Sequence, residues 1–233
     1  MIDFSRRSYK KELLDRDDIP FQDIAQNMRE LNKINILTGG HKITIKGFRN
    51  LAGKNKIISV CEIGCGGGDN LAAIEKYCIK QKIELISSGI DINSSCIDFA
   101  AKTYPNPNTI FIASDYKKAI VPKTDIIFCS LFTHHLAEKD LIELIKWMQS
   151  NSTLGFFIND LRRHFISYYF IKAATKLFSR SYLVKNDAPL SVLRGFRKIE
   201  WINIIKNSGI VDFKIRREWA FRHLVIVKNQ LSN

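Results

Sequence analysis

Short apolar runs alternate with amphipathic stretches through the middle of the chain. The runs are rich in Ile, Phe and Val and nearly continuous, as in strands buried on both faces of a parallel sheet. They span Lys56–Ile63, Glu84–Ile92, Thr109–Ala113, Asp125–Ser130 and Leu154–Asn159. Helical patterns separate them at Asn70–Gln81, Ser94–Thr103 and Glu138–Ser150. With two closing strands expected within residues 211–229, the pattern predicts an α/β fold with a doubly wound, mostly parallel, seven-stranded sheet.

Segments of a different character flank this alternating region. Residues 6–50 predict N-terminal helices, because Ile24, Met28, Leu31 and Ile34 recur at intervals of 4, 3 and 3. Thr38-Gly39-Gly40 ends that helix, and a second is expected from His41 to Leu51. Residues 160–195 form an insertion rich in aromatic side chains, which predicts either a helical lid over a binding site or an extra helix packed on the core.

The length of 233 residues favours one domain. We expect an N-terminal helical segment (1–55), a central core (56–160), a lid with further helices (161–208) and closing strands (209–233). No stretch approaches the roughly 18 apolar residues of a membrane span, and no signal peptide is visible. The sequence therefore predicts a cytoplasmic protein.

Five scattered cysteines are typical of reduced thiols, and Cys61 and Cys65 lack a second Cys/His pair at zinc spacing, so no metal site is expected. The net charge of +13 fits a nucleic acid, an anionic small substrate or a membrane surface. The basic residues are spread along the chain without a long block. The net charge alone therefore does not distinguish between these three kinds of partner.

The candidate chemistry begins with Glu62-Ile63-Gly64-Cys65-Gly66-Gly67-Gly68, which lies between the first expected strand and a helix. The glycines allow a sharp turn and let a ligand approach the backbone. Dinucleotide-binding loops place their third glycine three residues after the second, and this loop fits that spacing poorly.

The E-x-G-x-G-x-G pattern resembles motif I of the class I S-adenosylmethionine (SAM) methyltransferases, which have a Rossmann-like fold. The strand SSGIDI ends in Asp91, 25 positions after Gly66, where a carboxylate can accept hydrogen bonds from both ribose hydroxyls. The resemblance continues at Ala113-Ser114-Asp115, beside the adenine in the family, and at the fourth strand, which Asp125 opens and Ser130 ends. It implies SAM as cofactor, held by Glu62, Gly64, Cys65, Gly66, Gly68, Asp91, Ile92, Ser114, Asp115 and Ser130.

Two adjacent histidines follow the fourth strand. His134 and His135 lie just past the carboxyl end of that strand, where ligands bind in open α/β sheets. A neutral imidazole there can take the proton of a hydroxyl acceptor as methyl transfer proceeds. The two histidines are the candidate catalytic residues, and a structural capping or packing role is the alternative.

The acceptor predicted from these features is a small organic molecule, aromatic or lipid-like, methylated on a phenolic or other hydroxyl oxygen. Stretches such as LNKINILTGGHK, NDLRRH and FSRSYLVKNDAPLSVLRGF are similar to a bacterial subgroup of small-molecule methyltransferases associated with aromatic, polyketide or quinone-type metabolism. Arg162, Arg163 and His164 are candidates to bind an anionic acceptor. The Gly39-Gly40-His41 turn is a candidate to contact the cofactor carboxylate. The alternatives are an RNA methyltransferase and a non-catalytic SAM-binding subunit; the sequence does not predict an oligomeric state.

Overall fold

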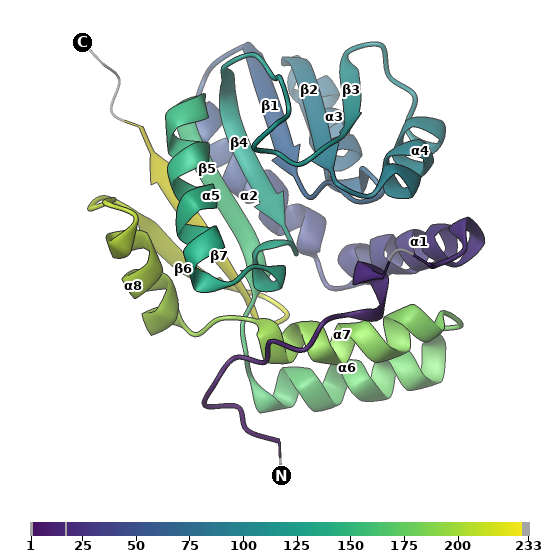
Figure 1. Ribbon diagram of the computed structural model, residues 1–233. Coiled ribbons are helices and arrows are strands. Elements are labelled where there is room, and N and C mark those ends of the chain that lie inside the picture. The colour runs from purple at the N-terminus through teal and green to yellow at the C-terminus, as the bar shows by residue number, and fades with distance from the viewer. Residues whose placement is uncertain (1, 17, 230–233) are drawn as a thin grey trace.

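The computed structural model describes residues 2–16 and 18–229, with seven strands in one sheet (Figure 1). The strands are β1 (Ile57–Ile63), β2 (Glu84–Asp91), β3 (Thr109–Ala113), β4 (Thr124–Ser130), β5 (Ser152–Leu161), β6 (Lys214–Glu218) and β7 (Arg222–Lys228). The α-helices are α1 (Phe21–Leu37), α2 (Gly40–Ala52), α3 (Asp69–Gln81), α4 (Ser94–Thr103), α5 (Glu138–Asn151), α6 (Phe165–Phe178), α7 (Tyr182–Arg194) and α8 (Lys198–Asn207). Two short 3-10 helices are η1 (Leu13–Asp15) and η2 (Thr133–His135).

The sheet has the strand order β3-β2-β1-β4-β5-β7-β6, which confirms the predicted fold class. The first five strands are parallel, and β7 runs antiparallel between β5 and β6. Because the strand order reverses direction at β1 and β4, the carboxyl ends of these two strands form the switch point where open α/β sheets bind ligands.

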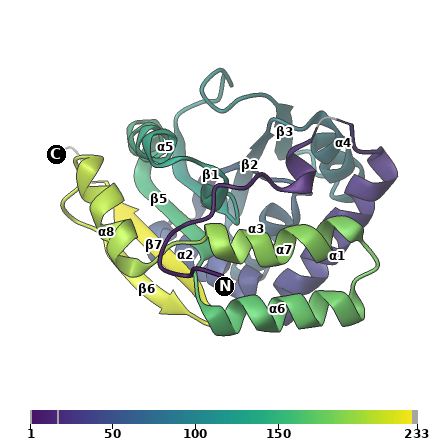
Figure 2. The same cartoon turned by 60° about the horizontal axis from the view of Figure 1, so that its bottom comes forward.

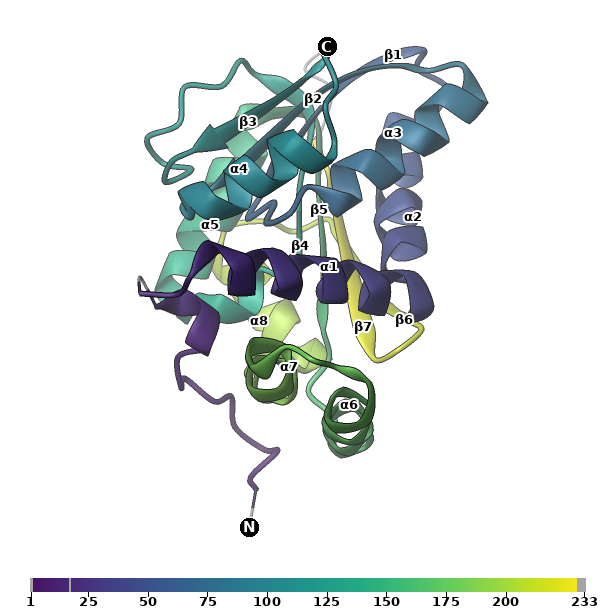
Figure 3. The same ribbon diagram turned by 90° about the vertical axis from the view of Figure 1, so that its right-hand side faces the viewer.

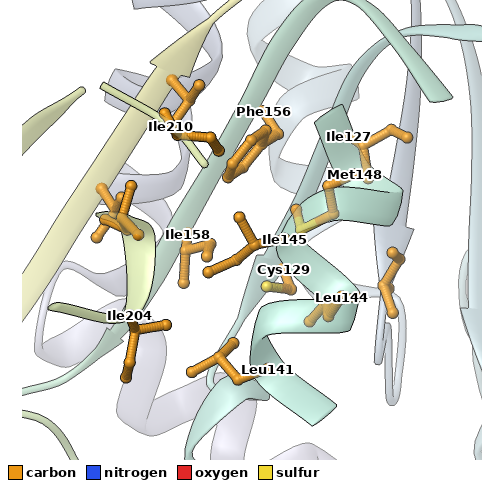
Figure 4. Close-up of a cluster of buried hydrophobic side chains, with 14 of the residues drawn as sticks. Ile127, Cys129, Leu141, Leu144, Ile145, Met148, Phe156, Ile158, Ile204 and Ile210 are labelled. Carbon is orange, nitrogen blue, oxygen red and sulfur yellow. The ribbon is translucent and has the colours of Figure 1, made fainter. Parts of the chain in front are cut away.

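Helices cover both faces of the sheet, and most side chains of the central strands are apolar and buried. One face packs on α2, α3 and α4, around the stacked rings of Phe128 and Phe157, whose centroids are 4.8 Å apart. The other face packs on α5 and α8. Figure 4 shows that second cluster, in which Leu144 and Ile145 of α5 meet Cys129 and Ile158 of the strands.

Helices α1, α6 and α7 lie beyond the carboxyl edge of the strands (Figure 1). Helix α7 packs against α1, α6, η1 and η2, so these elements form one assembly over the switch point. Figure 2 shows the N-terminal segment, residues 2–16, running beside α7. Figure 3, in which α6 and α7 are seen end-on, shows the two helices below α1.

The element predictions fail mainly at the N-terminus. Residues 6–16 and 18–20, expected within a helical segment, form no α-helix and only the short η1. Their backbone groups bond to α7 instead: the Leu13 and Leu14 amides donate to the Asp187 carboxylate at 2.8 and 3.0 Å. Tertiary hydrogen bonds replace the local ones that a helix would supply. The helix expected at His41–Leu51 and the strand-five insertion are present, the latter as two helices, α6 and α7.

Within the described residues, no helix is both long and apolar enough to cross a membrane. The five cysteines are free and buried.

Candidate active site

A cavity of about 1620 Å³ lies at the carboxyl edge of the sheet, enclosed by α1, α6, α7 and the turn between β6 and β7. Ten of the twelve residues proposed from the sequence line it. They are Gly64, Cys65, Gly66, Asp91, Ile92, Ser114, Asp115, Ser130, His134 and His135. Their convergence follows from the topology, because parallel strands end side by side.

The remaining two, Glu62 and Gly68, support the glycine loop without lining the cavity. Glu62 is fully buried and accepts a hydrogen bond from the Asn70 side chain at 3.0 Å. Burial, together with the charges of Asp69 and Asp91, raises the pKa of the Glu62 carboxyl well above its ordinary value. Gly68 precedes α3 with φ 78°, and a Cβ there would lie 3.0 Å from the Phe111 ring.

The glycine loop has a tight conformation that requires glycine. Gly64 and Gly66 have φ of 67° and 50°, a region that side chains with a Cβ rarely adopt. A Cβ on Gly64 would lie 2.2 Å from the ring of Phe132, which fills the space beside the loop. The Gly64 amide also donates to the Ile90 carbonyl at 2.8 Å, which fixes the loop to the end of β2.

Asp91 connects the loop to the end of β2. One carboxylate oxygen accepts from the Gly66 amide and the other from the Asn93 amide, both at 2.9 Å. Burial raises the pKa of Asp91, while these two amide hydrogen bonds oppose the rise. Each oxygen has a second lone pair, so the carboxylate is fixed in orientation and can still accept hydrogen bonds from a ligand.

Asp115 stabilises a turn at the neighbouring strand end. Its carboxylate accepts from the Lys117 amide at 3.0 Å, and the Ser114 hydroxyl donates to its carbonyl at 3.1 Å. Asp115 therefore caps this turn. It leaves the second carboxylate oxygen available on the cavity wall.

His134 is buried in a network of charged groups. Its Nδ1 lies 2.7 Å from Asp160, and its Nε2 lies 3.6 Å from Glu12. Burial alone lowers the pKa of the imidazole, but the Asp160 and Glu12 carboxylates outweigh that effect and raise the pKa to about 9. At neutral pH the His134 ring is therefore an imidazolium, with no free nitrogen to accept a proton.

His135 has a more open position on the cavity wall. Its side chain is 23% exposed, with Nδ1 3.2 Å from Asp15 and Nε2 3.7 Å from Glu12. The ring packs on that of His134 with centroids 4.4 Å apart. Of the two histidines, His135 has the side chain that a bound molecule can reach.

Ligand atoms of Glu12, His134 and His135 lie within 4.8 Å of one another, a spacing that can hold a metal ion. However, the proton that His134 retains competes with a metal for its nitrogen. Glu12 also accepts from the Ser191 hydroxyl at 2.7 Å and lies 4.0 Å from the Arg194 guanidinium. The charged groups of the cluster therefore pair with one another and with Arg194, as an ion-pair network.

Arg222, the first residue of β7, was not identified from the sequence. Its side chain is 3% exposed and lines the cavity, and one guanidinium nitrogen donates to the Asn35 side chain at 2.8 Å. The other terminal nitrogen is buried and has no hydrogen-bond partner among the described residues. Burial lowers the pKa of Arg222 to about 10, so it remains a cation at neutral pH. A buried cation with an unused donor is suited to bind an anionic group.

The expectation that the Gly39-Gly40-His41 turn faces the ligand is not met. His41 is directed to Asp69, at 2.7 Å, and none of these three residues lines the cavity. Among the basic run after β5, Arg162 lines the cavity, whereas the Arg163 guanidinium is fully buried and binds backbone carbonyls and Glu200. His164 stacks on Phe165 and Phe221 instead.

Comparison with known proteins agrees with this architecture. Residues 60–151 match the family model described as "Methyltransferase domain", and no curated protein matches the chain. The matched segment runs from β1 through α5 and contains the glycine loop, Asp91, Asp115 and both histidines. The match agrees with the methyltransferase activity that the sequence predicted.

Solved structures with the same fold extend over nearly the whole chain. The plantazolicin methyltransferase BpumL, in complex with SAH, has 19% identity and a TM-score of 0.66, covering 93% of this chain and 91% of its own. Human N-acetylserotonin methyltransferase, in complex with SAM, has 11% identity and a TM-score of 0.63, covering 90% and 56%. A putative O-methyltransferase from Nostoc punctiforme has 10% identity and a TM-score of 0.59, covering 86% and 59%. The fold is that of the class I methyltransferases.

Proposed function

We propose that this chain transfers the methyl group of SAM to a hydroxyl oxygen of a small aromatic or lipid-like acceptor. The observation that carries the proposal is the meeting of the glycine loop, Asp91, Asp115 and the buried Arg222 on one wall of a single cavity. SAM supplies an activated sulfonium, so the protein must mainly bind both reactants and orient them.

The residues present fit the three polar parts of SAM. The unpartnered nitrogen of Arg222 suits the carboxylate at the amino-acid end. Gly66 leaves room for that end beside the loop because, apart from the adjacent residues, the only atom within 4 Å of a Cβ placed there is Met28 Sδ, at 3.5 Å. Asp91 suits the ribose hydroxyls, and Asp115 suits the adenine amino group. Gly66, Cys65, Ile92, Ser114 and Ser130 line the space between.

The opposite wall of the cavity suits an apolar acceptor. Helices α6 and α7 present Ile166, Phe170, Phe178 and Val184 to the cavity, and α1 presents Leu31. Apolar walls of this kind bury the body of an aromatic or lipid-like molecule and exclude water from the reacting atoms. This division of the cavity into a polar and an apolar wall favours a small organic acceptor over RNA.

His135 is the group we assign to remove the acceptor proton. Asp15 lies beside Nδ1, and an Nδ1–H bond to this carboxylate leaves Nε2 as the acceptor nitrogen. With SAM bound, the methyl carbon would pass from sulfur to the acceptor oxygen, with the electron pair of the broken C–S bond remaining on sulfur. The acceptor proton would pass to Nε2 of His135. His134, held as an imidazolium between Asp160 and Glu12, positions the His135 ring by packing beneath it.

Incubation of the purified protein with methyl-labelled SAM and cell extract tests the proposal. Label should enter a solvent-extractable small molecule, and the Asp91→Ala variant should reduce that incorporation. Label confined to a defined RNA position at physiological salt would instead establish an RNA methyltransferase. Binding of SAM without transfer to any fraction would favour a non-catalytic subunit.

A further inference from the structure

Helix α6 exposes a large apolar surface that the fold does not cover. Three stripes run along the helix at spacings of three and four residues. The first contains Phe165, Tyr169, Lys172 and Lys176, and the second contains Ile166, Phe170, Ala173 and Leu177; all eight are exposed. The third contains Ser167, Ile171, Ala174 and Phe178, which line the cavity.

The outer surface is continuous with the cavity. Ile166 and Phe170 of the second stripe are exposed and also line the cavity, so they form a rim between outside and inside. The β6–β7 turn adds Trp219, which is 77% exposed and lines the cavity as well. His164 stacks on Phe221 at 4.9 Å, which places this turn beside the start of α6.

The segment that contains α6 and the start of α7 carries charged side chains of one sign. Residues 161–186 contain no Asp or Glu. They contain six basic residues: Arg162, Arg163, Lys172, Lys176, Arg180 and Lys185. A helix with aromatic and aliphatic side chains on one side and lysines at its edge is typical of helices that lie in the interface of an anionic bilayer.

A second copy of the chain fits this surface less well. Across a two-fold axis the same patch meets its own copy, and α6 carries no acidic residue that could pair with Lys172 or Lys176 of that copy. An anionic membrane neutralises the same lysines. The charge of α6 therefore favours a lipid surface.

We infer that the first and second stripes of α6 dock on an anionic membrane surface, and that the acceptor is a lipophilic molecule entering the cavity over Ile166 and Phe170. The membrane contact rests on the surface of α6 alone, whereas the nature of the acceptor rests on the proposed methyl transfer. No part of the chain need cross the bilayer.

Sedimentation with phospholipid vesicles tests the inference. The wild-type chain should bind phosphatidylglycerol vesicles at least roughly tenfold more tightly than phosphatidylcholine vesicles, and less tightly as salt increases. The triple variant Phe165→Ser, Tyr169→Ser, Leu177→Ser should lose most of the binding, because it removes apolar side chains that do not line the cavity. Lys172→Glu with Lys176→Glu should remove the preference for anionic vesicles.

A matched control carries Ile79→Ser, Ile120→Ser and Val211→Ser, three exposed apolar side chains away from α6, and should bind vesicles as the wild type does. Equal vesicle binding by the α6 triple variant and the wild type would overturn the inference. A second result would also overturn the inference: the wild type is a dimer, the triple substitution dissociates this dimer, and neither protein binds vesicles. Calorimetry of SAM binding separates the two proposals. If the folded chain does not bind SAM, the proposed methyl transfer is refuted, and the membrane contact is unaffected.

Discussion

His134 and His135 are adjacent in sequence but have different chemical surroundings. The ring of His134 is 3% exposed between two carboxylates, whereas that of His135 is 23% exposed on the cavity wall. The sequence indicated that both lie at the carboxyl end of β4. It did not distinguish them, because the distinction depends on Asp160 of β5 and Glu12 of the N-terminal segment.

The two histidines should respond differently to replacement by Gln. His135→Gln should lower kcat on a phenolic acceptor roughly 10²-fold or more with nearly unchanged SAM affinity, because a general base acts only as the proton departs. The loss should shrink as pH approaches the acceptor's own pKa, since an ionised phenolate needs no base. Near-normal turnover of His135→Gln at neutral pH would leave orientation alone to account for the transfer.

His134→Gln should mainly affect folding. It leaves Asp160 buried without its cation, which costs about 3–5 kcal/mol when a buried pair loses one partner. Chemical denaturation measures this loss, and methyl transfer per folded molecule should fall less than in His135→Gln. A catalytic defect in His134→Gln equal to that of His135→Gln, with unchanged stability, would reverse the two assignments.

The raised pKa of His134 also makes stability depend on pH. The folded chain holds this proton up to about pH 9, and an unfolded chain loses it near pH 6.5. The contribution is therefore complete below pH 6.5 and is lost as pH rises through 9. Denaturation curves between these values should show the wild type losing more free energy of unfolding than His134→Gln. Parallel curves for the two proteins would contradict the buried imidazolium.

At the level of elements, the glycine loop depends on the segment that follows β4. Phe132 packs where a Cβ of Gly64 would stand, and Leu131 before it has φ 53°, an uncommon conformation for a non-glycine residue. The motif in the sequence predicted the turn. It did not predict that a side chain from the end of β4 holds it in shape.

Gly64→Ala tests this packing. The substitution places a Cβ 2.2 Å from the Phe132 ring and adds a backbone penalty of about 1–2 kcal/mol. SAM affinity should fall along with stability, because the loop must move. Gly209→Ala, also at a positive φ but with no neighbour within 4 Å, is the matched control and should lose stability only. Unchanged SAM affinity in Gly64→Ala, measured by calorimetry, would show that the loop does not contact the cofactor.

The N-terminal segment, residues 2–16, shows why the prediction of a helix there was wrong. Its backbone is held by long side chains distant in sequence, such as Arg163 to the Phe4 carbonyl at 3.0 Å and Arg194 to the Lys10 carbonyl at 2.8 Å. No periodic pattern within residues 2–16 encodes these contacts. Hydrophobic periodicity predicts elements that pack locally, so it found α1 and the strands but not this segment.

For the whole molecule, the sequence predicted the sheet and most of the strand-end residues that line the cavity, because a topology of βαβ units places strand ends together. The sequence did not identify Arg222 as a site residue, because it lies in an antiparallel strand far along the chain from the glycine motif. Its role depends on β7 pairing beside β5 and on Asn35 of α1 orienting the guanidinium. Part of the net charge of +13 comes from residues 161–186, which contain six basic residues and no acidic one.

The most direct test of the account is calorimetric titration of SAM into the wild type and the Asp91→Ala variant. The wild type should bind SAM and its demethylated product at one site per chain. Asp91→Ala should weaken that binding by about 1.5–3 kcal/mol, the range for hydrogen bonds to a charged group. Equal affinity in the two proteins would remove Asp91 from the site, and no binding by the folded wild type would contradict the proposal that the cavity holds SAM.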